Sequence, residues 1–144
     1  MSTSHSILKR RCVLLVEDEA INYKYVRLVL AKVGLDVDIA CNGVEALEAT
    51  AMKDYALVLM DCRMPLMCGL ETTRRIRSAS SLALNRNIPI IAFTADVLDS
   101  NREACIEAGM NDWAAKPISM VALTQIVQKW LPDHRPLASV SGGG

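Results

Sequence analysis

The sequence alternates five times between a short apolar run and a longer stretch with helical spacing, and this alternation restricts the fold more than any other feature. Continuous apolar runs at 12–16, 57–60 and 88–93 are typical of strands buried in a parallel sheet. Weaker strand signals occur at 37–40 and 111–115. Strict alternation of strands and helices predicts an α/β fold, in which helices cover both faces of a parallel sheet.

Helices are predicted after each of these strands, over residues 21–33, 44–51, 70–78, 98–108 and 119–131. In the first helix, apolar residues recur at helical spacing, and we expect the following set to pack on the sheet: Ile21, Tyr25, Leu28, Val29 and Val33. Because crossovers between parallel strands are right-handed, few topologies are available. We predict a flavodoxin-like, doubly wound sheet of five strands in the order 2-1-3-4-5, with five helices.

The length of 144 residues predicts one domain. We place it at 11–132, between a flexible N-terminal segment (1–10) and a flexible C-terminal tail (133–144). The formal net charge of zero gives no indication of a nucleic acid or membrane partner. Five cysteines without a CxxC pair favour free thiols in a reducing compartment, so we expect a cytoplasmic protein.

Polar side chains directly follow four of the five predicted strands. Glu17 and Asp18 follow the first strand, Asp61 the third, Thr94 the fourth and Lys116 the fifth. In the predicted strand order these strands are neighbours, so their carboxyl ends meet at one edge of the sheet. Carboxylates brought this close raise each other's pKa, and a divalent cation would relieve that repulsion. Since the donors are oxygens and no Cys/His set is present, we expect a hard ion such as Mg²⁺.

This set of side chains suits phosphoryl transfer. A carboxylate beside Mg²⁺ can attack a phosphoryl group, and Asp61 is the best nucleophile because its strand is central. Lys116 would offer a positive charge to a phosphoryl oxygen, and Thr94 would donate a hydrogen bond to another. Glu17 and Asp18 would hold the metal.

Four stretches together resemble the receiver domain of response regulators in two-component phosphorelays. They are 13–19 (VLLVEDE), 59–65 (LMDCRMP) with Gly69, 90–95 (IIAFTA) and 115–118 (AKPI). Any one of these stretches is a weak signal, and all four in this order are a strong one. The resemblance covers roughly Cys12 to Trp130.

The resemblance implies a role for each site residue. Asp61 would accept a phosphoryl group from a phosphohistidine in a metal-dependent, autocatalytic reaction, so the domain would not be a conventional enzyme. The side chains of Asp18 and Asp61 and the backbone carbonyl of Arg63 would bind Mg²⁺ or Mn²⁺, with Glu17 acting through water. Lys116 would bind the phosphoryl group, and the family implies a cis bond between it and Pro117.

The same resemblance implies a switch and a set of partners. Thr94 would be a switch residue, and it would act on a face made by the fourth helix, fifth strand and fifth helix. Trp113 stands at the aromatic switch position, where the family usually has Tyr or Phe, and is either a second switch residue or a packing residue near the fifth strand. Arg63 and Asp96 would pair above the phosphoryl group and slow its hydrolysis. The partners would be a histidine kinase or a histidine phosphotransfer domain, and the switch face is the candidate surface for a homodimer. We expect the domain to come from a hybrid sensor histidine kinase whose membrane anchor, if any, lies outside this domain.

Three alternatives remain open from the sequence. The chain could be a stand-alone, single-domain response regulator. A phosphotransferase of the haloacid dehalogenase type also uses an Asp, Mg²⁺, a Thr and a Lys, but it needs an acid where Arg63 stands. A flavodoxin-like binder of FMN needs a neutral phosphate loop after the first strand, where Glu17, Asp18 and Glu19 would repel the phosphate.

Overall fold

A computed structural model describes residues 11–63, 66–95 and 99–132 of the chain. Its five strands form one parallel sheet in the order β2-β1-β3-β4-β5, so the predicted topology is confirmed. The predicted segments 1–10 and 133–144 lie outside the described residues. The strands are β1 (Cys12–Val16), β2 (Asp36–Ala40), β3 (Leu57–Asp61), β4 (Ile90–Thr94) and β5 (Asp112–Ala115).

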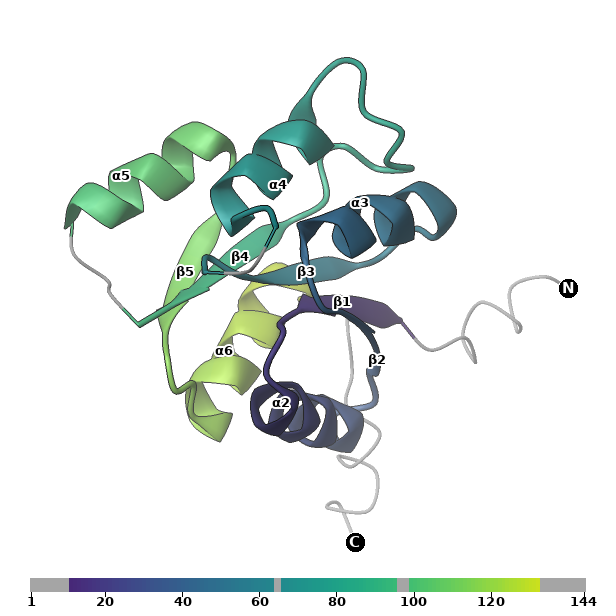
Figure 1. The fold of residues 1–144 in the computed structure, drawn as a ribbon. Helices are drawn as coiled ribbons and strands as arrows, with labels where there is room; N and C mark the ends of the chain where they lie inside the picture. The colour runs from purple at the N-terminus through teal and green to yellow at the C-terminus, as the bar shows by residue number, and fades with distance from the viewer. Residues whose placement is uncertain (1–10, 64–65, 96–98, 133–144) are drawn as a thin grey trace, which may run out of the picture.

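Helices cover both faces of this sheet, as Figure 1 shows. They are α2 (Ala20–Lys32), α3 (Gly43–Met52), α4 (Gly69–Arg77), α5 (Asp99–Ala108) and α6 (Met120–Trp130). Helices α2 and α6 lie on one face, and α3, α4 and α5 lie on the other. No helix in the described ranges combines the length and apolar character that crossing a membrane would require.

The continuous apolar runs become central strands because both of their faces are covered. Alternate residues of β1 contribute to separate cores: Val13 and Leu15 face α2 and α6, whereas Leu14 and Val16 face α3, α4 and α5. All five residues of β1 are buried, and so are all five of β3. Side chains on the two sides of the sheet therefore form two cores that share one layer of backbone.

Local signals set the ends of several elements where the sequence predicts them. The Ser119 side chain accepts a hydrogen bond of 3.0 Å from the Ala122 amide and caps α6. Gly34 and Gly109 follow α2 and α5 with φ of 84° and 107°, which only glycine adopts readily. Strand β4 begins two residues later than predicted, because its pairing with β3 starts at Ile90, opposite Val58.

The predicted buried face of α2 is wrong at three of its five residues. Ile21, Tyr25 and Leu28 are 79%, 40% and 60% exposed. The helix instead packs on the sheet through Val26, Val29 and Leu30, with Val33 half-buried just beyond it. The 13-residue helix carries two apolar stripes, and helical spacing alone does not tell which of them meets the core.

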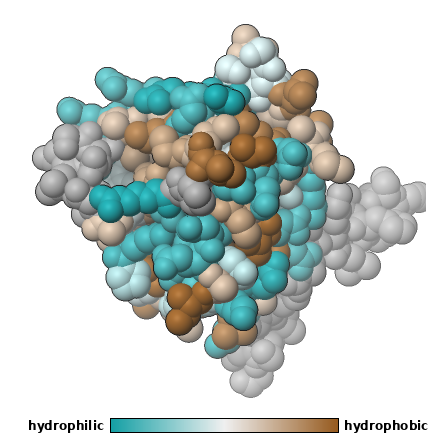
Figure 2. All heavy atoms as spheres, viewed as in Figure 1, coloured by the Kyte–Doolittle hydropathy of each residue, from teal (hydrophilic) through white to brown (hydrophobic). Residues whose placement is uncertain are grey.

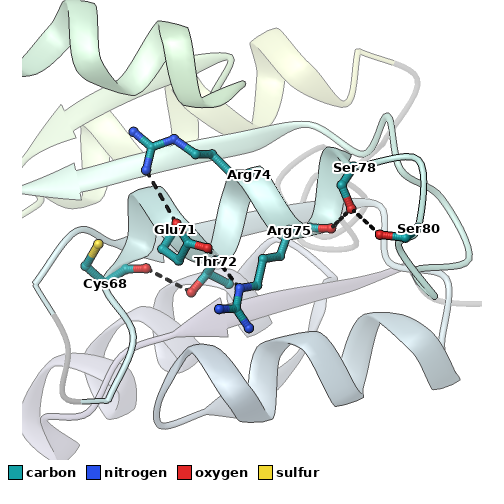
Figure 3. A network of polar contacts seen from close by, with 7 residues as sticks. All are labelled: Cys68, Glu71, Thr72, Arg74, Arg75, Ser78 and Ser80. Carbon is teal, nitrogen blue, oxygen red and sulfur yellow. Dashed lines mark hydrogen bonds and ion pairs between the residues drawn. The ribbon is translucent and has the colours of Figure 1, made fainter.

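Helix α4 shows how charged residues divide between the surface and the interior. Glu71 pairs with Arg74 at 3.6 Å and with Arg75 at 2.9 Å on the exposed face (Figure 3). At the end of the helix, the Ser78 hydroxyl donates a hydrogen bond of 3.0 Å to the Arg75 carbonyl. These contacts are short-range and largely in water, so they contribute little to stability.

Arg77, in the last turn of α4, is used differently. Its guanidinium donates to the carbonyls of Gly109 (3.0 Å) and Arg86 (2.6 Å) and to the Asn111 side chain (2.8 Å). The Asn111 side-chain oxygen also accepts a hydrogen bond of 2.8 Å from the amide of Ile90, at the start of β4. One partly buried cation thus connects α4, the 78–89 loop and the turn between α5 and β5.

We predict that replacing Arg77 by Met lowers the free energy of unfolding by on the order of 2 kcal/mol, because three charge-assisted hydrogen bonds are lost. Denaturant unfolding followed by circular dichroism measures this change. The matched control is Arg74→Met, which removes an exposed arginine of the same helix and is expected to change stability by less than about 0.5 kcal/mol. Equal effects of the two substitutions would contradict the role given to Arg77.

Candidate functional site

Three carboxylates converge at the carboxyl edge of the sheet. Glu17 and Asp18 directly follow β1, and Asp61 is the last residue of β3. The two strands pair in register, with Val16 opposite Met60, so they end at the same level. One carboxylate oxygen from each of the three residues lies within 4.8 Å of the others. The structure therefore brings together the acids that the sequence placed at neighbouring strand ends.

Lys116 compensates two of these charges. Its amine lies 3.0 Å from a Glu17 carboxylate oxygen and 2.9 Å from Asp61 Oδ2. Glu17 is 2% exposed and Asp61 is 4% exposed, so neither carboxylate is stabilised by bulk water. Asp18, in contrast, is exposed. Since a buried carboxylate is costly without an ionic partner, the lysine is required to keep this edge of the sheet charged.

Burial and ion pairing act in opposite directions on the two central groups. Burial raises the pKa of Asp61, although the hydrogen bond from Lys116 opposes that rise. Burial alone would lower the pKa of Lys116, but its bonds to Asp61 and Glu17 outweigh this effect and raise the pKa. Lys116 therefore stays protonated at neutral pH and offers a fixed positive charge beside Asp61.

Backbone groups orient the carboxylates further. The Arg63 amide donates a hydrogen bond of 3.1 Å to Asp61 Oδ1, and the Glu19 amide donates one of 3.2 Å to Glu17. The sequence predicted roles for the carbonyl and the side chain of Arg63 but not for its amide, so this contact was missed. A turn directly after a strand-end acid is the signal that could have indicated it.

Gly69 is a second residue whose contribution was missed. A Cβ atom at this position would lie 2.5 Å from the Asp61 carbonyl oxygen and 3.0 Å from Met60 Cγ. The Gly69 amide also donates a hydrogen bond of 3.2 Å to the Cys62 carbonyl. The start of α4 thus packs directly on the backbone that carries Asp61, and only glycine leaves room for this approach.

Thr94 and Lys116 lie side by side at the carboxyl ends of β4 and β5. Thr94 is the last residue of β4, and its carbonyl accepts a hydrogen bond of 2.8 Å from the Lys116 amide. The bond between Lys116 and Pro117 is cis, which confirms that expectation. Asp61 pairs with Phe93, the residue directly before Thr94, so Thr94 belongs to the same edge of the sheet as Asp61.

Trp113 lies further from this edge but shares a face with Thr94. It pairs with Ala92 in β4 and packs on the α3, α4 and α5 side of the sheet. Because side chains alternate along β4, Thr94 points to the same side as Ala92. The Arg102 guanidinium of α5 lies 4.9 Å from the centre of the Trp113 ring. Asp96, predicted to pair with Arg63, lies outside the described residues.

A groove of about 710 Å³ opens beside the acidic cluster. One of its walls is the start of α2, with Ile21, Asn22 and Tyr25, and another is formed by Lys116, Pro117 and Ile118. Glu17 also lines the groove. An apolar surface therefore leads directly to the charged residues at the end of the sheet.

The donor set fits a hard divalent cation. All three acids offer oxygen, and no described group of three or more metal-binding side chains includes a histidine or cysteine. Lys116 neutralises part of the negative charge of Glu17 and Asp61, but Asp18 brings a further carboxylate to the same place. The arrangement can thus bind a small hard cation and present Asp61 to an electrophile.

Comparison with known proteins agrees with this chemistry. Residues 13–128 match the family described as the response regulator receiver domain. The chain is 36% identical over 126 residues to hybrid signal transduction histidine kinase F of Dictyostelium discoideum, and the match covers 87% of this chain and 11% of that protein. It is 36% identical over 118 residues to sensor histidine kinase GacS of Pseudomonas protegens, covering 82% of this chain and 13% of that protein. The chain thus spans only a small part of the length of these relatives.

A solved structure with the same fold is the receiver domain of sensor histidine kinase PA1611 from Pseudomonas aeruginosa. It has a TM-score of 0.76 and 37% sequence identity, and the match covers 86% of this chain and 99% of that chain. That structure has a magnesium ion coordinated in its active-site cleft.

We predict that Gly69→Ala lowers the free energy of unfolding by on the order of 2 kcal/mol, because the new methyl group overlaps the Asp61 carbonyl. Denaturant unfolding measures the loss, and amide chemical shifts of residues 61–63 report the displaced backbone. The control is Glu71→Ala in the same turn, where the side chain is exposed and the expected change is below about 0.5 kcal/mol. A Gly69→Ala variant as stable as the parent protein would show that the backbone near Asp61 accommodates the methyl group, which would contradict the role given to Gly69.

Proposed function

Because this chain belongs to the response regulator receiver domain family, we propose that Asp61 accepts a phosphoryl group from a phosphohistidine. The observation that carries the proposal is the contact of 2.9 Å between Asp61 and the Lys116 amine, at the end of the central strand and within the acidic cluster. Family membership leaves the haloacid-dehalogenase-type phosphotransferase and the FMN-binding alternatives without support. In a stand-alone response regulator Asp61 would have the same role, and the domain would simply not be part of a larger kinase.

The residues of the chain divide the reaction among them. An Asp61 carboxylate oxygen forms a bond to phosphorus while the bond from phosphorus to the donor imidazole nitrogen breaks, and the electron pair stays on that nitrogen. Lys116, already beside Asp61, would bind a phosphoryl oxygen. The Thr94 hydroxyl would donate a hydrogen bond to another oxygen.

The acidic cluster would hold the divalent cation. Asp18 and Asp61 would bind it directly, with the Arg63 carbonyl as a further ligand and Glu17 acting through water. Mg²⁺ and Mn²⁺ both suit such oxygen ligands. When bound, the ion supplies positive charge that offsets the carboxylates and a phosphoryl oxygen.

We expect Asp61→Asn to abolish phosphoryl incorporation, because an amide is too weak a nucleophile. The measurement is intact-mass spectrometry after incubation with acetyl phosphate and Mg²⁺. Asp54→Asn is the matched control, since Asp54 is exposed and lies just before β3, at the opposite end of this strand. Incorporation that persists in Asp61→Asn would exclude Asp61 as the acceptor.

Millimolar Mg²⁺ is expected to raise the unfolding temperature of the protein, because the ion binds only the folded arrangement of carboxylates. Asp18→Asn should weaken this binding by about ten-fold or more, since a directly bound charge is lost. Thermal unfolding at a series of Mg²⁺ concentrations measures the affinity. Glu19→Gln serves as the control, because Glu19 is adjacent in sequence but outside the cluster. An equal effect of both substitutions would indicate general screening instead of a site.

We further propose that the phosphohistidine donor docks on α2. The exposed side chains of Ile21, Tyr25 and Leu28 recur at helical spacing and form an apolar stripe, and Figure 2 shows an apolar patch at the position of α2. Ile21 and Tyr25 also line the groove that leads to Lys116. A helix of a histidine kinase or histidine phosphotransfer domain packed on this stripe would hold its histidine at the sheet edge.

Docking on α2 predicts that substitutions there slow phosphoryl transfer from a protein donor but not from a small-molecule donor. Replacing Ile21 and Leu28 by Ser should slow transfer from a phosphorylated histidine phosphotransfer domain by about ten-fold or more, because apolar contact is lost. Phosphorylation by acetyl phosphate should change by less than about two-fold, since the reacting groups are untouched. Rates are followed by mass spectrometry. Exposed Leu82 and Leu84, in the 78–89 loop, provide the control pair for the same substitution. Equal slowing with both donors would contradict docking on α2.

Phosphorylation would be transmitted through Thr94. Thr94 and Trp113 point to the side of the sheet that α5 covers, so movement of Thr94 toward the phosphoryl group would reach β5 and α5. Helix α6, on the other face, would respond through β5, because Lys129 and Trp130 both contact the Asp112 carboxylate. The surface made by α5, β5 and α6 is also the proposed surface for a homodimer. Arg63 and Asp96 would shield the phosphoryl group from water.

The last proposal concerns the kind of protein to which this domain belongs. Receiver-domain relatives within hybrid and sensor histidine kinases favour an origin in a hybrid sensor histidine kinase. The domain itself would act in the cytoplasm and make no contact with a membrane, whereas its parent could carry an anchor. Its partners would then be the kinase or a histidine phosphotransfer domain.

A further inference from the structure

One arginine of α5 carries a buried polar atom that makes no hydrogen bond. Among the residues that the structure describes, the Nε nitrogen of Arg102 is the only buried side-chain nitrogen or oxygen without a hydrogen-bond partner. A buried N–H group that is not hydrogen-bonded lowers the stability of the arrangement that contains it, and folded proteins keep few such groups. The side chain of Arg102 therefore has a cost in this arrangement that calls for an explanation.

The position of Arg102 on α5 makes this nitrogen unusual. Arg102, Cys105 and Ala108 are spaced three residues apart, so they lie along one face of the helix. Cys105 and Ala108 are both buried, and Cys105 belongs to the core on the α3, α4 and α5 side of the sheet. Arg102 thus belongs to the face of α5 that packs on the sheet, near the end of the helix that follows Thr94.

The charged end of Arg102 contacts the aromatic residue at the proposed switch position. Its Cζ atom lies 4.9 Å from the centre of the Trp113 ring, which is within the range of a cation–π interaction. Trp113 lies opposite Ala92 and on the same side of the sheet as Thr94. One side chain therefore joins the start of α5 to the ring that would respond to Thr94.

The two ends of α5 are held in different ways. At the C-terminal end, the Gly109 carbonyl accepts a hydrogen bond of 3.0 Å from Arg77, and the Met110 amide donates one of 2.9 Å to the Cys105 carbonyl. Near the start, by contrast, the N–H of Arg102 has no acceptor. The end of α5 that follows Thr94 is thus the end at which this arrangement loses stability, while the other end is attached to α4.

We propose that Arg102 is a positioning residue of the phosphorylation switch. Its guanidinium holds the Trp113 ring. Its unpaired Nε–H destabilises the unphosphorylated arrangement relative to one in which the start of α5 has moved and the N–H has an acceptor. This role in switching rests on the proposed phosphorylation of Asp61. Because the two arrangements are then closer in free energy, the phosphoryl group needs to supply only a small difference to shift the population.

Arg102→Lys tests the unpaired N–H alone. In lysine a methylene group replaces Nε, and the ammonium nitrogen takes the place of the guanidinium carbon above the ring, so the cation–π contact is kept. The unphosphorylated variant is expected to unfold about 3 °C or more above the parent protein, because a cost present only in the folded arrangement is removed. Thermal unfolding followed by circular dichroism measures the shift.

The same variant is expected to accept a phosphoryl group from acetyl phosphate about five-fold more slowly or less, since the moved arrangement is less populated. Intact-mass spectrometry measures the rate. Arg74→Lys is the matched control, because Arg74 is exposed on α4 and the same atoms change there. The control should shift the unfolding temperature by less than about 1 °C and leave the rate within about two-fold of the parent rate.

Fluorescence tests the contact with the ring. The chain has two tryptophans, so a Trp130→Phe background leaves only the emission of Trp113. In that background, Arg102→Ala is expected to increase quenching by acrylamide about two-fold, because the guanidinium no longer covers the ring. Arg102→Lys should be quenched like the background protein, since its cation stays over the ring.

These measurements separate the role of Arg102 from the function proposed for Asp61. If the parent protein takes up no phosphoryl group, that function fails and the switching role of Arg102 fails with it, while the unfolding temperatures still decide whether the N–H destabilises this arrangement. An Arg102→Lys variant that is no more stable than the parent protein would overturn the proposal. A variant that is more stable but phosphorylated at the parent rate would overturn it as well, and so would equal quenching in Arg102→Ala and Arg102→Lys.

Discussion

The contact of Lys116 with two buried carboxylates is the interaction on which the functional edge of the sheet depends. Glu17 and Asp61 are almost completely withdrawn from water, and the lysine amine reaches both at about hydrogen-bond length. Without a cation between them, two adjacent carboxylates would repel each other and at least one would take up a proton. The lysine therefore opposes the rise that burial causes in the pKa of Asp61, and it places a cation where a phosphoryl group would bind.

This arrangement follows from parallel pairing. Strands β1, β3, β4 and β5 run in the same direction, so residues that follow each strand gather at one edge although they are far apart in the chain. Backbone contacts then refine the geometry, since the Arg63 amide bonds Asp61 and Gly69 packs on its carbonyl. The proposed acceptor, Asp61, is thus held by rigid elements, and the proposed donor surface on α2 and the proposed switch on α5 lie around it.

Most of the fold and the acidic edge could be predicted from the sequence, because both depend on local patterns. Apolar runs mark the strands, and a polar residue directly after each run must lie at the strand end whatever the helices do. The α2 face could not be predicted in the same way. Its two apolar stripes have similar spacing, and only packing against the sheet selects Val26, Val29 and Leu30 and leaves Ile21 exposed. The exposed stripe left beside the acidic edge is the surface that we propose for donor docking.

By itself, the sequence determined the order of strands and helices, the acids and the lysine at the strand ends, and the glycines that end α2 and α5. Each of these is a short-range property of residues close together in the chain. Tertiary structure alone decided that Arg77 connects three segments and that Gly69 lies close to the carbonyl of Asp61. These contacts join residues that are distant in sequence. They depend on how the helices pack on the twisted sheet, and no local sequence pattern predicts that packing.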